Sequence, residues 1–200
     1  MEKEMFEFYK NALLGGGITK PLCDEYRDEW RACGMDKERL VRLAMRQQSI
    51  PYFATFAYAN KGLSKEYLKK EFGYYINGYV IRDCDGVKDY TYGLYVDYDF
   101  ANVVDLGVDV SSFMWCEDVD VEVEETKCPV LYISNKSNVR LTLDGYNTTV
   151  VYLFDESVLT LEDGNETSKV LVYKYSDTAQ VIRTNYCDCK VNVFDKKIRL

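Results

Sequence analysis

The sequence LYISNKS at residues 131–137 recurs with substitutions along the rest of the chain. The related stretches are VYLFDES at 151–157, VYKYSDT at 172–178 and VNVFDKK at 191–197. Their first residues are 20, 21 and 19 positions apart. Each stretch leads into a polar turn, and after the first three turns a second strand pattern follows. Self-similarity at a fixed period of this length is typical of repeat architectures.

Two architectures are built from strand–turn–strand units of this size. A parallel β-solenoid has one unit per coil, and an antiparallel β-sandwich has one hairpin per unit. Repetition of residue type at equivalent positions favours the solenoid, because each apolar side chain would then stack on its counterpart one coil away. The Asp-Gly pairs at 144–145 and 163–164 are typical of type I′ hairpin turns, so the sandwich stays open as the alternative.

The alignment also places residues of one kind at equivalent positions. We expect three tyrosines to form an outward ladder: Tyr132, Tyr152 and Tyr173. We expect three polar residues to lie at one corner, where such side chains hydrogen-bond the turn: Asn135, Asp155 and Asp195. Weaker echoes that start at Leu94 and Phe113 would extend the array to five or six coils.

The first part of the chain follows a helical pattern instead, with apolar residues three and four positions apart. Helices are expected over residues 6–13 and 52–58, and further helices are expected to begin near Pro21, Asp36 and Ser64. Charge divides the chain in the same place: residues 1–80 carry 13 Lys+Arg and 11 Asp+Glu (+2), whereas residues 81–200 carry 12 and 22 (-10), which sum to -8. The sequence therefore predicts an α+β protein with a helical docking subdomain at 1–80 and a repetitive β domain at 81–200.

The composition excludes several classes of function. The 200 residues include no histidine, which rules out Ser-His-Asp and Cys-His catalysis and histidine-ligated zinc. Glycine-rich phosphate loops and nucleophile-elbow motifs are also missing, so we expect a non-enzymatic protein without a cofactor. A pI near 4.8 argues against a duplex nucleic-acid partner. We find no signal peptide and no apolar run long enough to cross a membrane, so we expect synthesis in the cytoplasm.

Tyrosine, with 18 residues, supplies the candidate binding surface. Its rigid, amphipathic ring offers contact area to a glycan or to a protein partner, and cross-strand packing is the alternative role. The candidate binding residues are Tyr92, Tyr95, Tyr132, Tyr152 and Tyr173. Cys187 and Cys189 share one strand face, but no second cysteine pair would complete four ligands, so no metal site is expected.

Four stretches of the first part resemble small uncharacterised proteins that are carried by phages and prophages of gut Bacteroidales. They are GITKPLC at 17–23, RQQSIPY at 46–52, KGLSK at 61–65 and YING at 75–78. The repetitive half resembles solenoid segments of phage structural and adhesive proteins. The resemblance implies a mobile-element setting, synthesis in a bacterial cytoplasm and the virion as one destination, and it brings no catalytic residues.

We therefore expect a phage-type structural or binding protein. Its helical part would dock to a larger assembly, and its acidic, tyrosine-rich β part would present a surface to a protein partner or to itself. The strand pattern runs to residues 198–200 without a polar cap, which indicates a homo-oligomer. Two alternatives stay open: an acidic, DNA-mimicking inhibitor of a host protein, and a hydrolase that uses paired carboxylates on a solenoid.

Overall fold

The computed structural model describes residues 24–34, 36–46, 64–77, 80–82, 91–105, 109–124 and 128–196. The helices expected over residues 6–13 and 52–58 lie outside these ranges.

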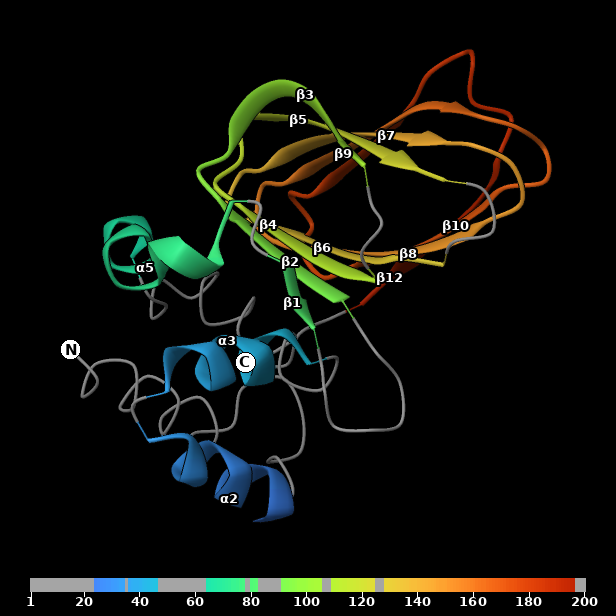
Figure 1. Ribbon diagram of the computed structural model, residues 1–200. Coiled ribbons are helices and arrows are strands. Elements are labelled where there is room, and N and C mark those ends of the chain that lie inside the picture. Colours follow the sequence, from blue (N-terminus) through green and yellow to red (C-terminus); the bar gives the residue numbers. More distant parts are fainter. Residues whose placement is uncertain are drawn as a thin grey trace.

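The second part of the chain is a parallel β-solenoid of about five turns with about 20 residues per coil (Figure 1). Each coil gives one strand to each of two facing sheets. Sheet A runs in the order β1 (Val80–Arg82), β2 (Thr91–Val96), β4 (Val110–Met114), β6 (Val130–Ser134), β8 (Thr148–Leu153), β10 (Lys169–Lys174) and β12 (Lys190–Asp195). Sheet B runs in the order β3 (Asp99–Asp105), β5 (Asp118–Val123), β7 (Asn138–Leu143), β9 (Val158–Gly164) and β11 (Gln180–Arg183). The solenoid prediction is confirmed, and the sandwich is excluded because β7, β8 and β9 pair in parallel with strands one coil away.

Strict alternation along the strands builds the core between the two sheets. In β7 and β8, every second residue is buried and its neighbours are partly exposed. Leu131, Val151 and Val172 are partners in successive coils, as the alignment predicts, and each is fully buried. From β6 onward this inward row of aliphatic side chains stacks from coil to coil, and such burial is the main source of hydrophobic stabilisation.

The register predicted for the last repeat is wrong by two residues. Val172 pairs with Val193, not with Val191, because 21 residues separate the partners. A slip of two leaves every side chain on the same face of the sheet, so the apolar pattern does not reveal it. As a result Asp195 lies within β12, where it pairs with Lys174 of β10, and it does not lie at the corner.

The weaker repeats that start at Leu94 and Phe113 also have a register that differs from the expected one. Phe113 pairs with Ile133, two residues further along the repeat than expected. Leu94 pairs with Ser112, and Ser112 pairs with Tyr132, so the expected position of Leu94 was wrong by one residue. The partners in β4 and β6 are 20 residues apart, whereas the expected starts at Phe113 and Leu131 are 18 apart, and this difference explains the shift of Phe113.

The corner after the sheet A strands is held by residues with positive φ. Asp97, Trp115, Asn135 and Asp155 have φ between 52° and 57°. The Asn135 and Asp155 prediction holds, because the backbone N–H of Asn135 donates to Asp155 Oδ2 at 2.8 Å. Asn and Asp adopt this left-handed conformation more readily than most residues, so the corner chemistry follows from the sequence.

The described helices of the first part are α2 (Asp24–Cys33), α3 (Lys37–Met45) and α5 (Lys65–Phe72), and α5 continues into the short 3₁₀ helix η1 (Gly73–Tyr75). The expected caps are present: the Asp36 side chain accepts from Arg39 N at 3.0 Å, and Ser64 Oγ accepts from Tyr67 N at 3.1 Å. Gly34, at φ 54°, follows the end of α2.

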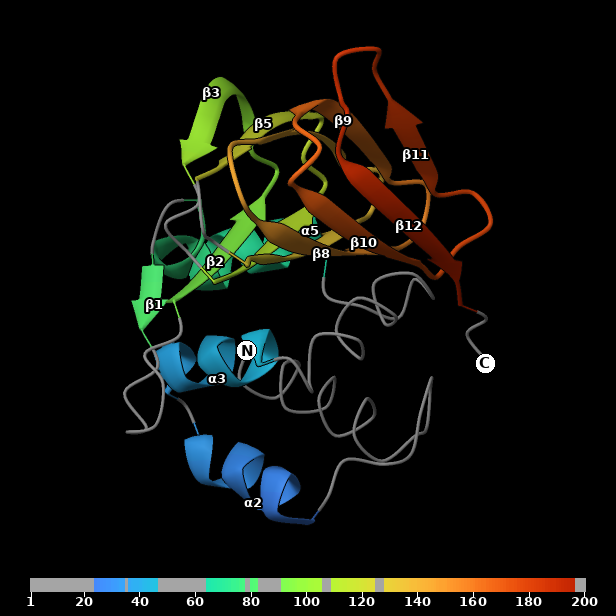
Figure 2. The same ribbon diagram turned by 90° about the vertical axis from the view of Figure 1, so that its right-hand side faces the viewer.

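Helices α3 and α5 lie against the β2 end of sheet A, and α2 packs on α3, on the side away from the sheet (Figures 1 and 2). Leu40 and Leu43 of α3 and Leu68 of α5 belong to one buried cluster with Leu94 and Met114 of the sheet. None of the described helices is long and apolar enough to span a membrane.

Candidate binding surface

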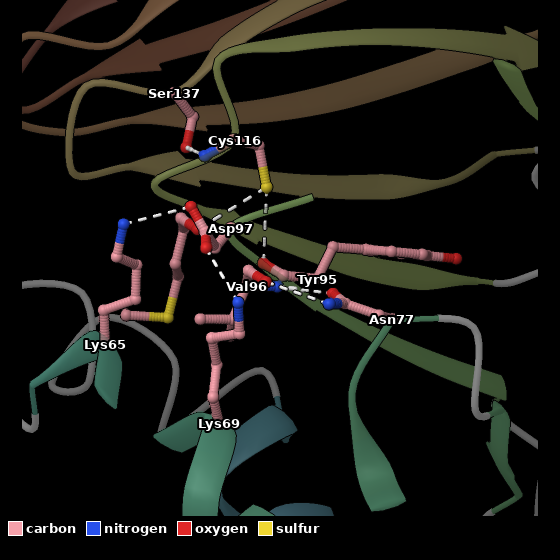
Figure 3. Close-up of polar contacts among 9 residues, drawn as sticks. Lys65, Lys69, Asn77, Tyr95, Val96, Asp97, Cys116 and Ser137 are labelled. Carbon is pink, nitrogen blue, oxygen red and sulfur yellow. Dashed lines mark hydrogen bonds and ion pairs between the residues drawn. The ribbon is translucent and has the colours of Figure 1, made fainter. Parts of the chain in front are cut away.

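The β2 end of sheet A is closed by residues just before it in the chain. β1 pairs antiparallel with the first half of β2, from Thr91 to Gly93. Along the second half of β2 the edge is bonded by Asn77, which has a φ of 58°. The backbone N–H of Asn77 donates to Leu94 O at 2.8 Å. Its side-chain amide donates to Val96 O at 3.0 Å and accepts from Val96 N at 2.9 Å (Figure 3). A single amide thus satisfies the backbone groups that a further strand would otherwise bond.

An ion-pair cluster fixes α5 to the first corner beside this closure. The carboxylate of Asp97 lies 3.0 Å from Lys65 Nζ and 2.8 Å from Lys69 Nζ (Figure 3). Hydrogen bonds from Lys69 and Lys65 lower the pKa of Asp97 below its ordinary value. The side chains remain about one-third to one-half exposed, so the cluster positions the helix more than it stabilises the fold.

Three of the five candidate tyrosines are buried. Tyr95 points into the core, where its ring stacks on Phe113 at 5.0 Å, and burial raises the pKa of its hydroxyl to about 12. Tyr92 is buried in the cluster shared with the helices. Tyr132 lies on the outer face of sheet A but is only 1% exposed, and burial raises its pKa as well. Gly93 is the sequence signal for the inward Tyr95, because a Cβ there would lie 2.8 Å from that ring.

The predicted tyrosine ladder does form. The ring centroids of Tyr132 and Tyr152 are 4.7 Å apart, and those of Tyr152 and Tyr173 are 5.2 Å apart. Sequence reasoning missed the continuation of this ladder to Phe194, at 5.2 Å from Tyr173, because the last repeat was aligned two residues out of register. Exposure rises along the row from buried Tyr132, through partly buried Tyr152 and Tyr173, to Phe194 at 42%.

A second, shorter row runs beside the ladder. Phe154 stacks on Tyr175 at 5.0 Å, and the Nζ of Lys196 lies 5.5 Å above the Tyr173 ring. We call the partly or fully exposed members of both rows the aromatic surface: Tyr152, Tyr173, Tyr175 and Phe194. This surface lies on the part of sheet A nearest to β12.

The opposite end of the solenoid has no such closure among the described residues. β12 is the last strand of sheet A and pairs with β10 along one edge only. The backbone N–H groups of Lys190 and Lys196 donate back to Ser168 and Lys174. In a parallel strand the alternate residues face the other way, so the N–H and C=O groups of Val191, Val193 and Asp195 point to the free edge. Figure 2 shows β12 and β11 at this end, away from β1.

In the part of the chain that the structure describes, no further coil covers the core-position side chains at this end. Val193 occupies the row of Leu131, Val151 and Val172, all of them fully buried, yet it is 47% exposed. Ile182 of β11 is also 46% exposed, but it pairs with Thr160 and lies on the outer face of sheet B. An apolar side chain at a core position beside free backbone groups is the usual character of a surface that pairs with another strand.

The acidic residues of sheet B are partly neutralised. Arg140 of β7 lies between two carboxylates of β5, with its NH1 2.6 Å from Asp118 Oδ1 and its NH2 2.9 Å from Asp120 Oδ2. Its hydrogen bond lowers the pKa of Asp120. Two arginines of the helical part are also paired: Arg42 of α3 with Glu38 at 3.0 Å, and Arg46, the residue that follows α3, with Glu29 at 2.6 Å.

The cysteine pair of the last coil is buried, and Cys187 Sγ lies 2.8 Å from Cys189 Sγ. Within the described residues, no group of three or more His, Cys, Asp or Glu side chains is placed to hold a metal ion. Comparison of the chain with protein-family models, with curated proteins and with solved structures finds no match. The geometry alone therefore supports the functional proposal.

Proposed function

We propose that the protein is a non-enzymatic structural and binding protein whose last coil binds a second copy of the same chain. The observation that carries the proposal is Val193, a core-position side chain left 47% exposed on the free edge of β12. A phage or mobile-element setting is supported by the repeat architecture and by the sequence resemblance. In that setting the helical part would contact the larger assembly through its polar faces.

A second copy fits this edge under two-fold symmetry. A two-fold axis perpendicular to sheet A places β12 of one copy antiparallel to β12 of the second copy. Side chains that face the core in one copy are then beside core-facing side chains of the other, and outward-facing side chains are beside outward-facing ones. Two residues that lie opposite each other in such a pair must be on the same face of the sheet. Because residues on one face of a strand are an even number of positions apart, the numbers of two opposed residues add up to an even total. When Asn192 faces Asn192 of the second copy, Val191 faces Val193 of that copy, and both carry outward-pointing backbone groups.

The next possible register is less favourable. When Val193 faces its own copy, Val191 lies opposite Asp195 and Lys190 lies opposite Lys196 of the second copy. That arrangement places a carboxylate in the apolar row and two like charges opposite each other, which is destabilising. The register centred on Asn192 instead joins the two cores and places Lys190 beside Phe194 of the other copy, where a cation–π contact is available.

The closed β2 end determines the type of assembly. Asn77 and β1 occupy the edge of β2, so head-to-tail stacking of solenoids would have to displace them. An isologous pair through β12 is closed and does not grow into a filament. We therefore expect a dimer.

Sedimentation equilibrium of the full chain at micromolar concentrations tests the proposal. A dimer is expected for the parent protein and a monomer for Val193→Pro, because proline removes an outward donor without touching the bonds between β12 and β10. Tyr146→Ala, which removes an exposed ring far from β12, is the matched control and should stay dimeric. A monomeric parent protein, or a dimer that survives Val193→Pro, would overturn the proposal.

Disulfide cross-linking tests the register, in a Cys128→Ser background that removes the one exposed thiol among the described residues. Asn192→Cys should give a covalent dimer under mild oxidation, since directly opposed residues of a non-hydrogen-bonded pair suit disulfide geometry. Phe194→Cys should not, because its own copy lies four residues away along the partner strand. Cross-linking of Phe194→Cys alone would contradict the register.

A further inference from the structure

The last coil contains a pair of buried thiols. Cys187 and Cys189 flank Asp188 in the connection between β11 and β12, and their side chains are on the same side of the backbone. Their Sγ atoms are 2.8 Å apart, and the two residues are 2% and 1% exposed. The two sulfurs therefore contact each other directly in a site closed to bulk solvent.

The backbone around the pair is fixed on several sides. Cys187 forms an isolated parallel bridge with Gly164, and the N–H of Asp188 donates to Gly164 O at 2.6 Å. Arg183 Nε donates to Cys187 O, also at 2.6 Å. Holding two reacting groups in contact in this way raises their effective concentration toward each other.

Gly164 provides the space that the thiols fill. A Cβ on this residue would lie 3.3 Å from Cys189 Cβ and 3.6 Å from Cys187 Sγ. Even a methyl group at this position would require the Cys189 side chain to shift by a few tenths of an ångström. The Asp-Gly sequence at 163–164, which resembles a hairpin turn, thus serves to admit two sulfurs one coil above it.

We propose that Cys187 and Cys189 form a redox-sensitive modification site, which hydrogen peroxide converts into an intrachain disulfide. In the first step one thiolate attacks a peroxide oxygen: an S–O bond forms, the O–O bond breaks, and water leaves after protonation. In the second step the other sulfur attacks the sulfenic sulfur: the S–S bond forms, the S–O bond breaks, and a second water leaves. Two thiols lose two electrons, and one peroxide is reduced to two waters.

The surroundings set the rate of this reaction. Burial raises the pKa of Cys189 to about 12, and the thiolate is the reactive form. Oxidation of the folded chain is therefore slow at neutral pH and accelerates as the pH rises. The other described cysteines are placed differently: Cys33 and Cys116 are buried and Cys128 is exposed, and no other described thiol is in contact with any of them.

Peptide mass spectrometry of the full chain, in the Cys128→Ser background, tests the proposal. Trypsin cuts after Arg183 and Lys190, so both cysteines fall in one peptide, residues 184–190, which contains no other cysteine. After peroxide treatment and alkylation we expect this peptide to lose two hydrogens and to take up no alkyl group until it is reduced. Recovery of the doubly alkylated peptide after prolonged treatment at pH 9 would overturn the proposal.

The contribution of the fold is measured by comparing folded and unfolded chains. Against a glutathione redox buffer, the folded chain is expected to favour the disulfide at least about tenfold more than the chain in urea, since only the fold holds the sulfurs together. Equal constants would contradict a preorganised site. Cys187→Ser and Cys189→Ser are the control variants, and each should stop at a trappable sulfenic acid. Val193→Pro should oxidise like the parent, which separates this site from dimerisation.

Discussion

The two ends of the solenoid differ in how the backbone groups at the edge of sheet A are bonded. At the β2 end, Asn77 and β1 bond the free backbone groups, and α5 is pinned to the first corner through Asp97. At the β12 end, the described residues leave the outer edge free and Val193 half exposed. The β2 end of the solenoid therefore excludes a further strand, whereas the free edge of β12 can pair with one. The difference between the two ends lies in β1, Asn77 and α5, which precede β2 in the chain.

The largest expected difference separates the interior coils from the open end. Leu141, fully buried in β7, should lose about 3 kcal/mol of unfolding free energy when it is replaced by alanine, because its removal leaves a cavity. Val193→Ala should cost less than about 1 kcal/mol in dilute protein, since half of that side chain already faces water. Urea denaturation of both variants measures the contrast. Similar losses would mean that the end coil is covered in the monomer.

The closed end can be opened by one substitution. Asn77→Gly removes the side-chain amide but keeps the positive φ, and it should cost about 1–2 kcal/mol for two lost hydrogen bonds. Asn77→Ala should cost about 1 kcal/mol more, since alanine is strained in this conformation. Hydrogen exchange at the amide of Val96, whose acceptor is removed, should accelerate in both variants. An unchanged exchange rate would show that another group protects this edge.

The smallest expected effect is that of the ion-pair cluster on α5. The pKa of Asp97 is lowered in the folded state, so its contribution is present above its ordinary pKa of 3.8 and is lost as the pH falls through the lower, folded value. Asp97→Asn tolerates the same backbone conformation and should lower the unfolding free energy by a few tenths to about 1 kcal/mol at pH 7. Thermal unfolding curves of the parent and variant should converge toward pH 3 and in high salt.

The sequence determines the repeat but not every register. Three local features of the sequence predict the solenoid. The period near 20 residues gives the length of a coil, the alternation gives the buried face of each strand, and Asn135 and Asp155 suit the backbone conformation of the corner. The position of Val193 could not be predicted in the same way, because a shift by two residues preserves the inward and outward faces. Only the pairing with Val172 shows the true register, and with it the place of Phe194 in the ladder.

The candidate site shows a similar limit. Tyr152 and Tyr173 lie on the predicted ladder, but the burial of Tyr132 depends on tertiary packing that strand alternation does not encode. Tyr95 turns inward because it pairs with Phe113 and, through Phe113, with the Ile133 row, which is one residue away from the expected Tyr132 row. The edge of β2 is closed by an amide, and no short-range pattern marks Asn77 for that role.

The stacked coils also give the molecule a mechanical direction. Each coil contacts mainly its two neighbours, so a pull on the end that carries β12 would peel one coil at a time. The first three steps would separate stacked rings, beginning with Phe194 from Tyr173. The coil of β2, held by Asn77 and by the lysines of α5, would detach last. Under load, the solenoid would lengthen in steps of one coil and keep its attachment to the helices until the end.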